Sequence, residues 1–593
     1  MVRLMGATGA PRWDLDRFYP GLSSPAYKEA FEALRNEISA FREAVERTGD
    51  WLMEAINRQN QATDLAESLE SFVYTTYSTE TGNTEALQQL DKLSELMVAF
   101  TDAAARFRYR LRREQEDVRP LWDEGGPLEA YSHVLEEQLR LAEFQMDVGE
   151  EALAAELDRS GGELWGRLQE AISSELSTLW DASTGERKSV TELRALAFDP
   201  DREVRKRAYR LELELWESVE TPLAYAINGV KGFASSVNRR RGHESDLERA
   251  TIQARLTPKA LETMISVMRE SLPLFRNYLT AKAKLLGVER IAFYDLFAPV
   301  GEESGGWTWR EATEFIIHHF EGFSEDLGAL ARRAFSESWI DGEPRKGKVG
   351  GAYCTSFPGF GESRILANFD GSFSSVSTLA HELGHAYHFE ILKDQPASLR
   401  SYPMTLAETA SIFCETHIFY SRMAEGSTNQ LAILEHLLQE TTQVIVDILS
   451  RFIFEGSLFE EKQRGFVAPG RLKELMLDAQ DATYAEGMDP DQRHPYMWAV
   501  KGHYYSTRLG YYNFPYAFGQ LFGLGLYAQY LQSPETFPGQ YRRLLQLTGR
   551  SPATEVAATA GFDLESPDFW RSGIELIRTF ARSYEEEVAR TLS

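Results

Sequence analysis

The pattern of apolar and polar positions predicts helices over most of the chain. From Ala26 to about Trp180, apolar residues recur at steps of three and four with charged residues between them, which is the spacing of amphipathic helices. One helix is expected to begin after the turn Thr81-Gly82-Asn83. Its apolar stripe comprises Leu87, Leu90, Leu93, Met97 and Phe100. Helical spacing returns from Ser374 to the C-terminus, so the expected class is mainly α.

A second helix start suggests where the chain divides. Asp199 is expected to cap a helix, and Pro200 suits its first position because proline lacks the backbone N–H that a first turn leaves unbonded. The polar segment 182–188 precedes this start and has the composition of a connector. We therefore expect a boundary near 185–200, with an N-terminal helical domain of residues 1–190 and a second domain of residues 191–593.

Signals for β structure are concentrated between Gly347 and Phe369, where glycines and a proline separate short apolar runs. A small sheet is expected there. The apolar segment from Phe514 to Leu531 approaches membrane-spanning length, but Pro515, two glutamines and three tyrosines interrupt it. We expect it to be a buried helix.

Charge and cysteine content narrow the classes of partner and compartment. The 593 residues include 63 Lys and Arg against 90 Asp and Glu, a net charge of −27, which argues against nucleic acid or an anionic membrane as the main partner. Two cysteines, Cys354 and Cys414, cannot form a disulfide framework, and two buried free thiols are expected. The first residues lack the apolar run of a secretion signal, so a cytoplasmic protein is expected.

The segment His381-Glu382-Leu383-Gly384-His385 carries an HExxH motif. Two histidines four residues apart on a helix project from nearly the same side and can bind one zinc ion. Ser374 or Ser375 is expected to cap this helix. Its apolar stripe comprises Val376, Leu379, Leu383 and Ala386, which leaves both imidazoles on the opposite face. Glu382 is placed to take a proton from water and pass it to a leaving amine.

A peptidase zinc ion needs a third protein ligand. The metzincin pattern is excluded, because His388 and Ile391 stand where it requires glycine and histidine. Glu390 follows on the same helix but faces away from the histidines. Downstream, Glu408 and Glu415 lie seven residues apart on one helical face, so one can bind the metal while the other orients a ligand. Spacing alone leaves both assignments open.

HELGHAYH followed by ETASIFCE resembles the oligoendopeptidase F branch of the thimet-oligopeptidase family of zinc metallopeptidases. The N-terminal segment RWDLDRFYPGLSSPAYKEAF, the GGAYC loop and the C-terminal segment GHYYSTRLGYYNFPYAFGQLF extend the resemblance over nearly the whole chain. It implies two largely helical lobes around a deep substrate channel, with a small β-sheet beside the zinc-binding helix. It also implies that residues 1–190 form an N-terminal lid region and residues 191–593 the catalytic zinc peptidase domain.

The resemblance also assigns roles to residues. It implies that Glu408 is the third zinc ligand and that Glu415 orients a ligand. His503 and Tyr516, with Tyr512 behind them, match the family's histidine and tyrosines that donate hydrogen bonds to the oxyanion. One zinc ion per chain is expected, bound by His381, His385 and Glu408, and the implied substrates are short unstructured peptides.

The expected function is therefore a zinc endopeptidase, with two alternatives. An exopeptidase of the dipeptidyl-carboxypeptidase type would need a cationic residue to bind a terminal carboxylate. A non-catalytic peptide-binding protein has no need for both the metal ligands and Glu382. The oligomeric state is left open by the sequence.

A peptide substrate is most simply held by pairing with an edge strand. The run from Arg364 to Phe369 lies shortly before the HExxH motif and is expected to be that edge. Gly350, Gly351 and Tyr353 are expected on the opposite side of the site, because glycine permits close approach of a peptide.

Overall fold

The computed structural model describes residues 9–301, 306–426 and 430–593, and its contacts divide the chain into two compact units. Unit 1 consists of Met1–Glu143, Gly305–Gly426 and Phe522–Asp563, and unit 2 consists of Phe144–Ser304, Ser427–Leu521 and Leu564–Ser593. Each unit thus combines three separate segments, which differs from a division at residue 190. As a boundary between sequence domains, that division stays a prediction.

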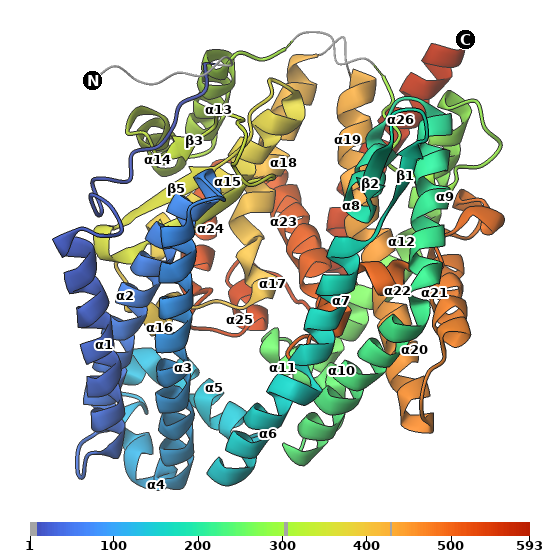
Figure 1. The fold of residues 1–593 in the computed structure, drawn as a ribbon. Coiled ribbons are helices and arrows are strands. Elements are labelled where there is room, and N and C mark those ends of the chain that lie inside the picture. Colours follow the sequence, from blue (N-terminus) through green and yellow to red (C-terminus); the bar gives the residue numbers. More distant parts are fainter. Residues whose placement is uncertain (1–8, 302–305, 427–429) are drawn as a thin grey trace. The chain divides into compact units, whose positions relative to one another are not determined.

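Both units are built almost entirely of helices (Figure 1), which confirms the mainly α class. The helices of unit 1 are α1 (Pro25–Glu46), α2 (Leu52–Thr79), α3 (Thr84–Arg113), α4 (Gln115–Val118), α5 (Ser132–Glu143), α13 (Trp309–Phe323), α14 (Glu325–Ser336), α15 (Phe373–Leu392), α16 (Ala397–Arg400), α17 (Met404–Ala407), α18 (Thr409–Glu425), α24 (Phe537–Leu547) and α25 (Ala553–Ala558). The substrate channel implied by the resemblance stays a prediction.

Unit 2 contains α6 (Val148–Gly161), α7 (Glu163–Glu175), α8 (Val190–Ala195), α9 (Arg202–Ser218), α10 (Glu220–Arg240), α11 (Asp246–Gln253), α12 (Pro258–Leu285), α19 (Gln430–Thr442), α20 (Ile448–Arg464), α21 (Pro469–Tyr484), α22 (Met497–Val500) and α26 (Pro567–Leu592). Helix α23 (Phe514–Gln532) begins in unit 2 and ends in unit 1. It covers the apolar segment that was expected to be a buried helix, and most of its side chains are buried. Among the described residues, no helix combines the length and apolar character needed to span a bilayer.

Helix α3 begins where the sequence predicts. The side chain of Asn83 accepts a hydrogen bond from the backbone N–H of Ala86 at 3.0 Å and caps the first turn. Leu93, in the middle of the predicted stripe, is buried together with residues of α1 and α2. The start of α9 was predicted two residues too early, because Asp201, not Asp199, caps that helix. The Asp199 carboxylate instead accepts from the N–H of Asp201 and forms a turn before the helix.

The segment predicted as a polar connector is part of a β-hairpin in unit 2. Strands β1 (Ser177–Asp181) and β2 (Glu186–Ser189) pair antiparallel, and Gly185 between them takes a positive φ of 74°. The sequence prediction missed this hairpin because β2 is polar and short, with no alternation of apolar residues.

The helices of unit 2 enclose a buried charge cluster. Glu212 of α9 is 5% exposed and accepts hydrogen bonds from Arg194 at 2.5 Å and from the His494 ring at 3.1 Å. Burial opposes ionisation of this carboxyl, but its interactions with the His494 ring and with Arg194 outweigh burial and lower the pKa of Glu212 to about 2.

The predicted small sheet lies in unit 1 and has the strand order β3-β5-β4. Strand β5 (Glu362–Leu366) is central, pairing in parallel with β3 (Ile340–Asp341) and antiparallel with β4 (Tyr353–Phe357). The expectation that Arg364–Phe369 forms an edge is therefore wrong, since β5 is flanked on both sides and completely buried. Strand β4, which pairs antiparallel with β5, is an edge strand of this sheet.

Candidate active site

Helix α15 carries both histidines of the HExxH motif on one face, as its periodicity predicts. The apolar stripe packs inside unit 1, and Val376, Leu379 and Leu383 have no exposed surface. The side chains of His381 and His385 remain 23% and 24% exposed. The cap is Ser372, not Ser374 or Ser375, because an Asp370 turn ends the preceding segment and lets the helix begin at Phe373.

Gly384, inside the motif, allows α18 to lie directly against α15. A Cβ atom on Gly384 would stand 2.6 Å from the carbonyl oxygen of Ala410 and 2.6 Å from the Cα of Ser411. Only glycine permits this contact between the two backbones. The close approach brings Glu408, which immediately precedes α18, beside the two histidines.

The three side chains form a group suited to a metal ion. One ligand atom from each of His381, His385 and Glu408 lies within 4.8 Å of the others. Glu408 Oε2 is 3.3 Å from His381 Nε2 and 3.5 Å from His385 Nε2. Ligand bonds of roughly 2.0–2.1 Å in tetrahedral zinc separate neighbouring ligand atoms by roughly 3.3–3.4 Å. The nitrogen and oxygen donors therefore fit zinc in both chemistry and spacing.

Glu415 binds the other side of the first histidine. Its Oε2 atom lies 2.9 Å from His381 Nδ1, and its Oε1 atom accepts a hydrogen bond from Ser377 Oγ at 3.3 Å. A carboxylate on Nδ1 favours the tautomer that carries its proton there, so Nε2 keeps its lone pair for a metal. This geometry favours Glu408 as the ligand and Glu415 as the orienting group, the choice that spacing left open. Glu390 instead pairs with Lys393 and Arg333.

Ionisation within the group suits metal binding. Burial opposes the charge on Glu408, but the hydrogen bond from His381 and the nearby imidazoles lower the pKa of Glu408 to about 2. Burial, aided by the charge of His381, lowers the pKa of His385 to about 4, so this imidazole is neutral at pH 7. Zinc binds carboxylate and neutral imidazole, which are the forms of Glu408 and His385 here. Burial opposes the charge on His381, but its hydrogen bonds to Glu408 and Glu415 raise its pKa, so zinc must displace a proton from this ring.

Glu382 lies beside the histidines and is 6% exposed. Burial raises the pKa of Glu382 to about 7, and the nearby backbone N–H of Cys354 offsets part of this rise. A carboxyl with a pKa close to neutrality can both accept and release a proton. Cys354 and Cys414 are free thiols, the first half-buried and the second buried.

The remaining predicted residues gather in unit 2. The hydroxyls of Tyr512 and Tyr516 are 2.8 Å apart, and the Tyr512 ring centroid lies 5.5 Å from that of His503. Asn513, which the sequence prediction missed, lies between them in the chain and places its Nδ2 atom 2.8 Å from His503 Nε2. No local sequence signal marks Asn513, because its partner is ten residues away.

Asn513 determines which nitrogen of His503 carries the proton. Arg451 Nη1 donates to Asn513 Oδ1 at 3.0 Å, which sets the orientation of the amide and turns its Nδ2 donor toward the ring. His503 Nε2 must therefore accept, and the ring proton resides on Nδ1. Burial, followed by the charge of Arg451, lowers the pKa of His503 to about 2 and keeps the ring neutral.

Strand β4 presents backbone groups on the side away from β5. The N–H groups of Ile365 and Ala367 bond to the β3 side of the sheet, so the alternate residues of β5 bond to β4. Cys354 and Ser356 therefore point their N–H and C=O groups outward. Tyr353, expected on the opposite side of the site, belongs to this same strand and is bonded to Ser78 at 2.6 Å.

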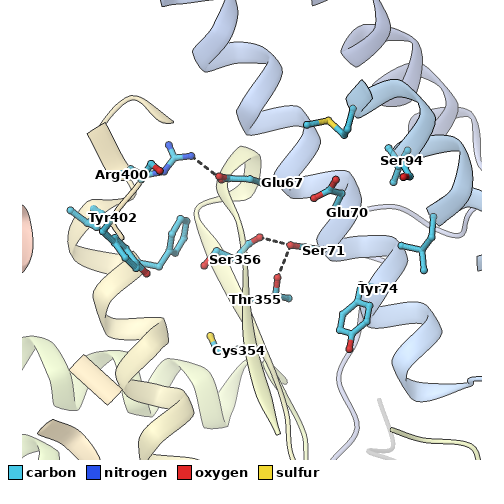
Figure 2. Close-up of a pocket in the computed structure, with 16 residues that line it drawn as sticks. Glu67, Glu70, Ser71, Tyr74, Ser94, Cys354, Thr355, Ser356, Arg400 and Tyr402 are labelled. Atoms are coloured by element: carbon cyan, nitrogen blue, oxygen red, sulfur yellow. Dashed lines mark hydrogen bonds and ion pairs between the residues drawn. The ribbon is translucent and has the colours of Figure 1, made fainter. Parts of the chain in front are cut away.

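Beside this strand edge lies a pocket of about 790 Å³, entirely within unit 1 (Figure 2). Its walls come from α2, α3, β4, the end of α15 and residues 400–402. Gly350 and Gly351, expected near the substrate, are not among the described residues that line it.

Comparisons with known proteins place these features in a family context. The model of peptidase family M3 matches residues 195–576, which is more than half of the chain. The model of the oligopeptidase F N-terminal region matches residues 87–177.

Two curated relatives align over most of their length. The chain is 24% identical to oligopeptidase PepF of Bacillus subtilis (strain 168) over 572 residues, covering 94% of the chain and 84% of that protein. It is 26% identical to the group B oligopeptidase PepB of Streptococcus agalactiae serotype III (strain NEM316) over 544 residues, covering 89% of each. The crystal structure of oligoendopeptidase-F from Enterococcus faecium has the same fold, with a TM-score of 0.69 at 17% identity, covering 95% of the chain and 99% of that structure.

Proposed function

The chain belongs to peptidase family M3, and on that premise we propose that it is a zinc-dependent endopeptidase that cuts short unstructured peptides at internal bonds. The observation that carries the proposal is the spacing of His381, His385 and Glu408. Glu408 Oε2 lies 3.3 Å from His381 Nε2 and 3.5 Å from His385 Nε2, beside the buried carboxyl of Glu382. A peptide-binding protein without activity would not need this combination.

The metal ligands and Glu382 have separate tasks. When bound, zinc polarises the scissile carbonyl and lowers the pKa of water. Glu382 takes one proton from the attacking water and delivers it to the amide nitrogen, so the peptide C–N bond breaks to give a carboxylic acid and an amine.

The cluster in unit 2 supplies hydrogen-bond donors in this proposal. The proton on His503 Nδ1 and the hydroxyls of Tyr512 and Tyr516 donate to the oxygen that becomes negative in the transition state. Because His503 stays neutral, its tautomer, and not its charge, determines whether it can donate.

The outer edge of β4 is proposed to hold the substrate backbone. Cys354 directs its backbone groups away from β5, and an extended peptide can pair with the edge there. At Ser356 the outward carbonyl already accepts a hydrogen bond from Ser71. This edge replaces the Arg364–Phe369 run of the sequence prediction. It includes Cys354, whose backbone N–H lies near Glu382, so a peptide bound there would lie next to the proposed general base.

An endopeptidase fits better than a dipeptidyl carboxypeptidase. The latter needs a cation free to bind a terminal carboxylate. Arg400 is the cationic residue among the described residues that line the pocket, and it is already bonded to Asp64, Glu67 and the carbonyl of Gln395. Its two terminal nitrogens thus already donate to protein acceptors, and its charge is paired with two carboxylates. The cytoplasmic setting stays a prediction.

The variant Glu382→Gln tests the proposal. It should retain about one zinc per chain, measured by elemental mass spectrometry, while kcat/KM for a quenched fluorescent peptide falls by roughly 10²–10⁴. The matched control is Glu390→Gln on the same helix, which should keep wild-type activity. Full activity of Glu382→Gln with zinc retained would show that Glu382 is not the general base.

A further inference from the structure

The pocket beside β4 starts at the proposed reaction centre. It is lined by Cys354, Thr355 and Ser356 of β4, and the backbone N–H of Cys354 lies near Glu382. On the other side, Ser71 of α2 donates to the carbonyl oxygen of Ser356 at 2.8 Å. A peptide paired with β4 would therefore direct one of its side chains into this pocket (Figure 2).

The pocket has an apolar wall. Side chains of α3 and of the end of α15 form it: Leu90, Leu93, Met97, Phe389 and Leu392. Such a surface can cover the aliphatic part of a long side chain but leaves its tip to be satisfied elsewhere.

Charge in the pocket is unbalanced. Arg400, with its side chain 8% exposed, serves two carboxylates at once, Asp64 at 2.5 Å and Glu67 at 3.2 Å. Glu70, one turn from Glu67 on α2, also lines the pocket. Among the described residues Glu70 has no hydrogen bond or cationic partner, as Figure 2 illustrates. Arg400 therefore cannot neutralise all three acids.

The surroundings of Glu67 and Glu70 disfavour the negative charge of their ionised carboxylates. Glu70 is exposed to solvent, but partial desolvation by the surrounding protein raises its pKa above the usual value. The side chain of Glu67 is half exposed, yet partial desolvation raises its pKa despite Arg400, and the neighbouring charges of Asp64 and Glu70 add to the effect. A cation entering the pocket would relieve this repulsion, whereas an apolar side chain would desolvate Glu70 without giving it a partner.

We propose that this pocket binds the side chain of a lysine or arginine in the substrate peptide, and that Glu70 determines the preference. The aliphatic stem would lie on the apolar wall, and the ammonium or guanidinium group would pair with Glu70. The inference rests on the proposed function, because it deepens that site by naming its substrate class. Glu70 acts here on binding and takes no part in proton transfer.

The test compares peptides that differ at one position. The zinc-loaded enzyme is given quenched fluorescent peptides that are blocked at both ends. The peptides are identical except at one position, which carries Lys, Gln, Glu or Leu, and this position is moved in turn through each site around the cut bond. At one position Lys should exceed Gln by about fivefold in kcat/KM, and Glu should fall below Gln. In Glu70→Gln that Lys-to-Gln ratio should fall to about one.

Asp91→Asn is the matched control. Asp91 is exposed on α3, carries the same charge and does not line the pocket, so its variant should keep the wild-type Lys-to-Gln ratio. An equal loss in both variants would mean that the preference comes from the overall negative field, and the proposal would be wrong. A preference for Leu at that position, or an unchanged ratio in Glu70→Gln, would overturn it as well.

Failure of the proposed function is distinguishable from failure of this inference. If peptides are cut in a zinc-dependent way without a basic preference, the inference alone fails. If none is cut, the proposed function fails, and fluorescence anisotropy of the Lys and Gln peptides on the wild-type and Glu70→Gln proteins still decides whether the pocket selects a cation. Equal affinities for the two peptides would then reject it.

Discussion

Gly384→Ala tests whether the contact between α15 and α18 sets the geometry of the metal ligands. The added methyl group would stand 2.6 Å from the backbone of Ala410 and Ser411. To reach an ordinary van der Waals contact of about 3.4 Å, the two helices would have to move apart by about 0.8 Å. Metal sites tolerate roughly 0.2 Å in ligand position, so Glu408 would be displaced well beyond that range relative to the histidines.

The expected result is a loss of zinc affinity larger than the loss of stability. Overpacking costs about 1–3 kcal/mol, but alanine in place of a helix glycine recovers about 1 kcal/mol. The free energy of unfolding should therefore fall by about 0–2 kcal/mol. Zinc affinity, measured by competition with a chromogenic chelator, should fall at least about tenfold, with kcat/KM at limiting zinc falling in parallel.

Gly322→Ala is the control for this experiment. Gly322 lies in α13 of the same unit, and a Cβ there meets no atom within 4 Å. This variant should bind zinc as the wild type does and unfold at an equal or slightly higher temperature. Wild-type zinc affinity in Gly384→Ala would show that the helix contact does not position Glu408, and the reasoning would be refuted.

Three further predictions concern the groups that orient the site and the charge cluster of unit 2. Glu415→Ala removes the acceptor on His381 Nδ1, so zinc affinity should fall about 10- to 100-fold in the same chelator competition; an unchanged affinity would contradict the orienting role. Asn513→Asp replaces the donor to His503 by a carboxylate, which moves the ring proton to Nε2, and ring ¹⁵N chemical shifts should report this change. In this variant kcat should fall about 10²-fold with little change in KM. A wild-type kcat together with the altered tautomer would exclude His503 as a donor. The pKa of Glu212 in the folded protein is about 2, below the usual 4.5. The ionised carboxylate therefore stabilises the fold fully at a pH above 4.5, and this stabilisation is lost as the pH falls toward 2. The gap in unfolding free energy between wild type and Glu212→Gln should therefore narrow by about 3 kcal/mol between pH 6 and pH 2 in urea titrations, and a constant gap would rule out the depressed pKa.

The sequence predicts the parts of the site that lie within one helix. The spacing of His381 and His385 and the apolar stripe of α15 both follow from a period of 3.6 residues, and the structure has them as expected. The sequence also leads to the correct mainly α class. Whether Glu408 or Glu415 faces the metal depends on how closely α18 approaches α15, and that distance is visible only once Gly384 is placed against Ala410.

Features that depend on distant partners were missed or placed wrongly. Strand β5 was expected at the edge because its second neighbour, β3, is only two residues long and comes from a segment without a β pattern. Glu70 and Arg400 meet in one pocket although 330 positions separate them in the chain. Asn513 is oriented by Arg451, which lies on α20, 62 positions earlier in the chain. Periodicity describes single elements and carries no information about such pairings.

The most direct test of the central claim is mass spectrometry of the products from a short peptide blocked at both ends, incubated with the protein with and without a zinc chelator. The account predicts internal cuts that disappear with the chelator and return when zinc is added back. An intact blocked peptide, where the same peptide with free ends is trimmed, would contradict the endopeptidase assignment, and cuts that persist in the chelator would contradict the metal mechanism.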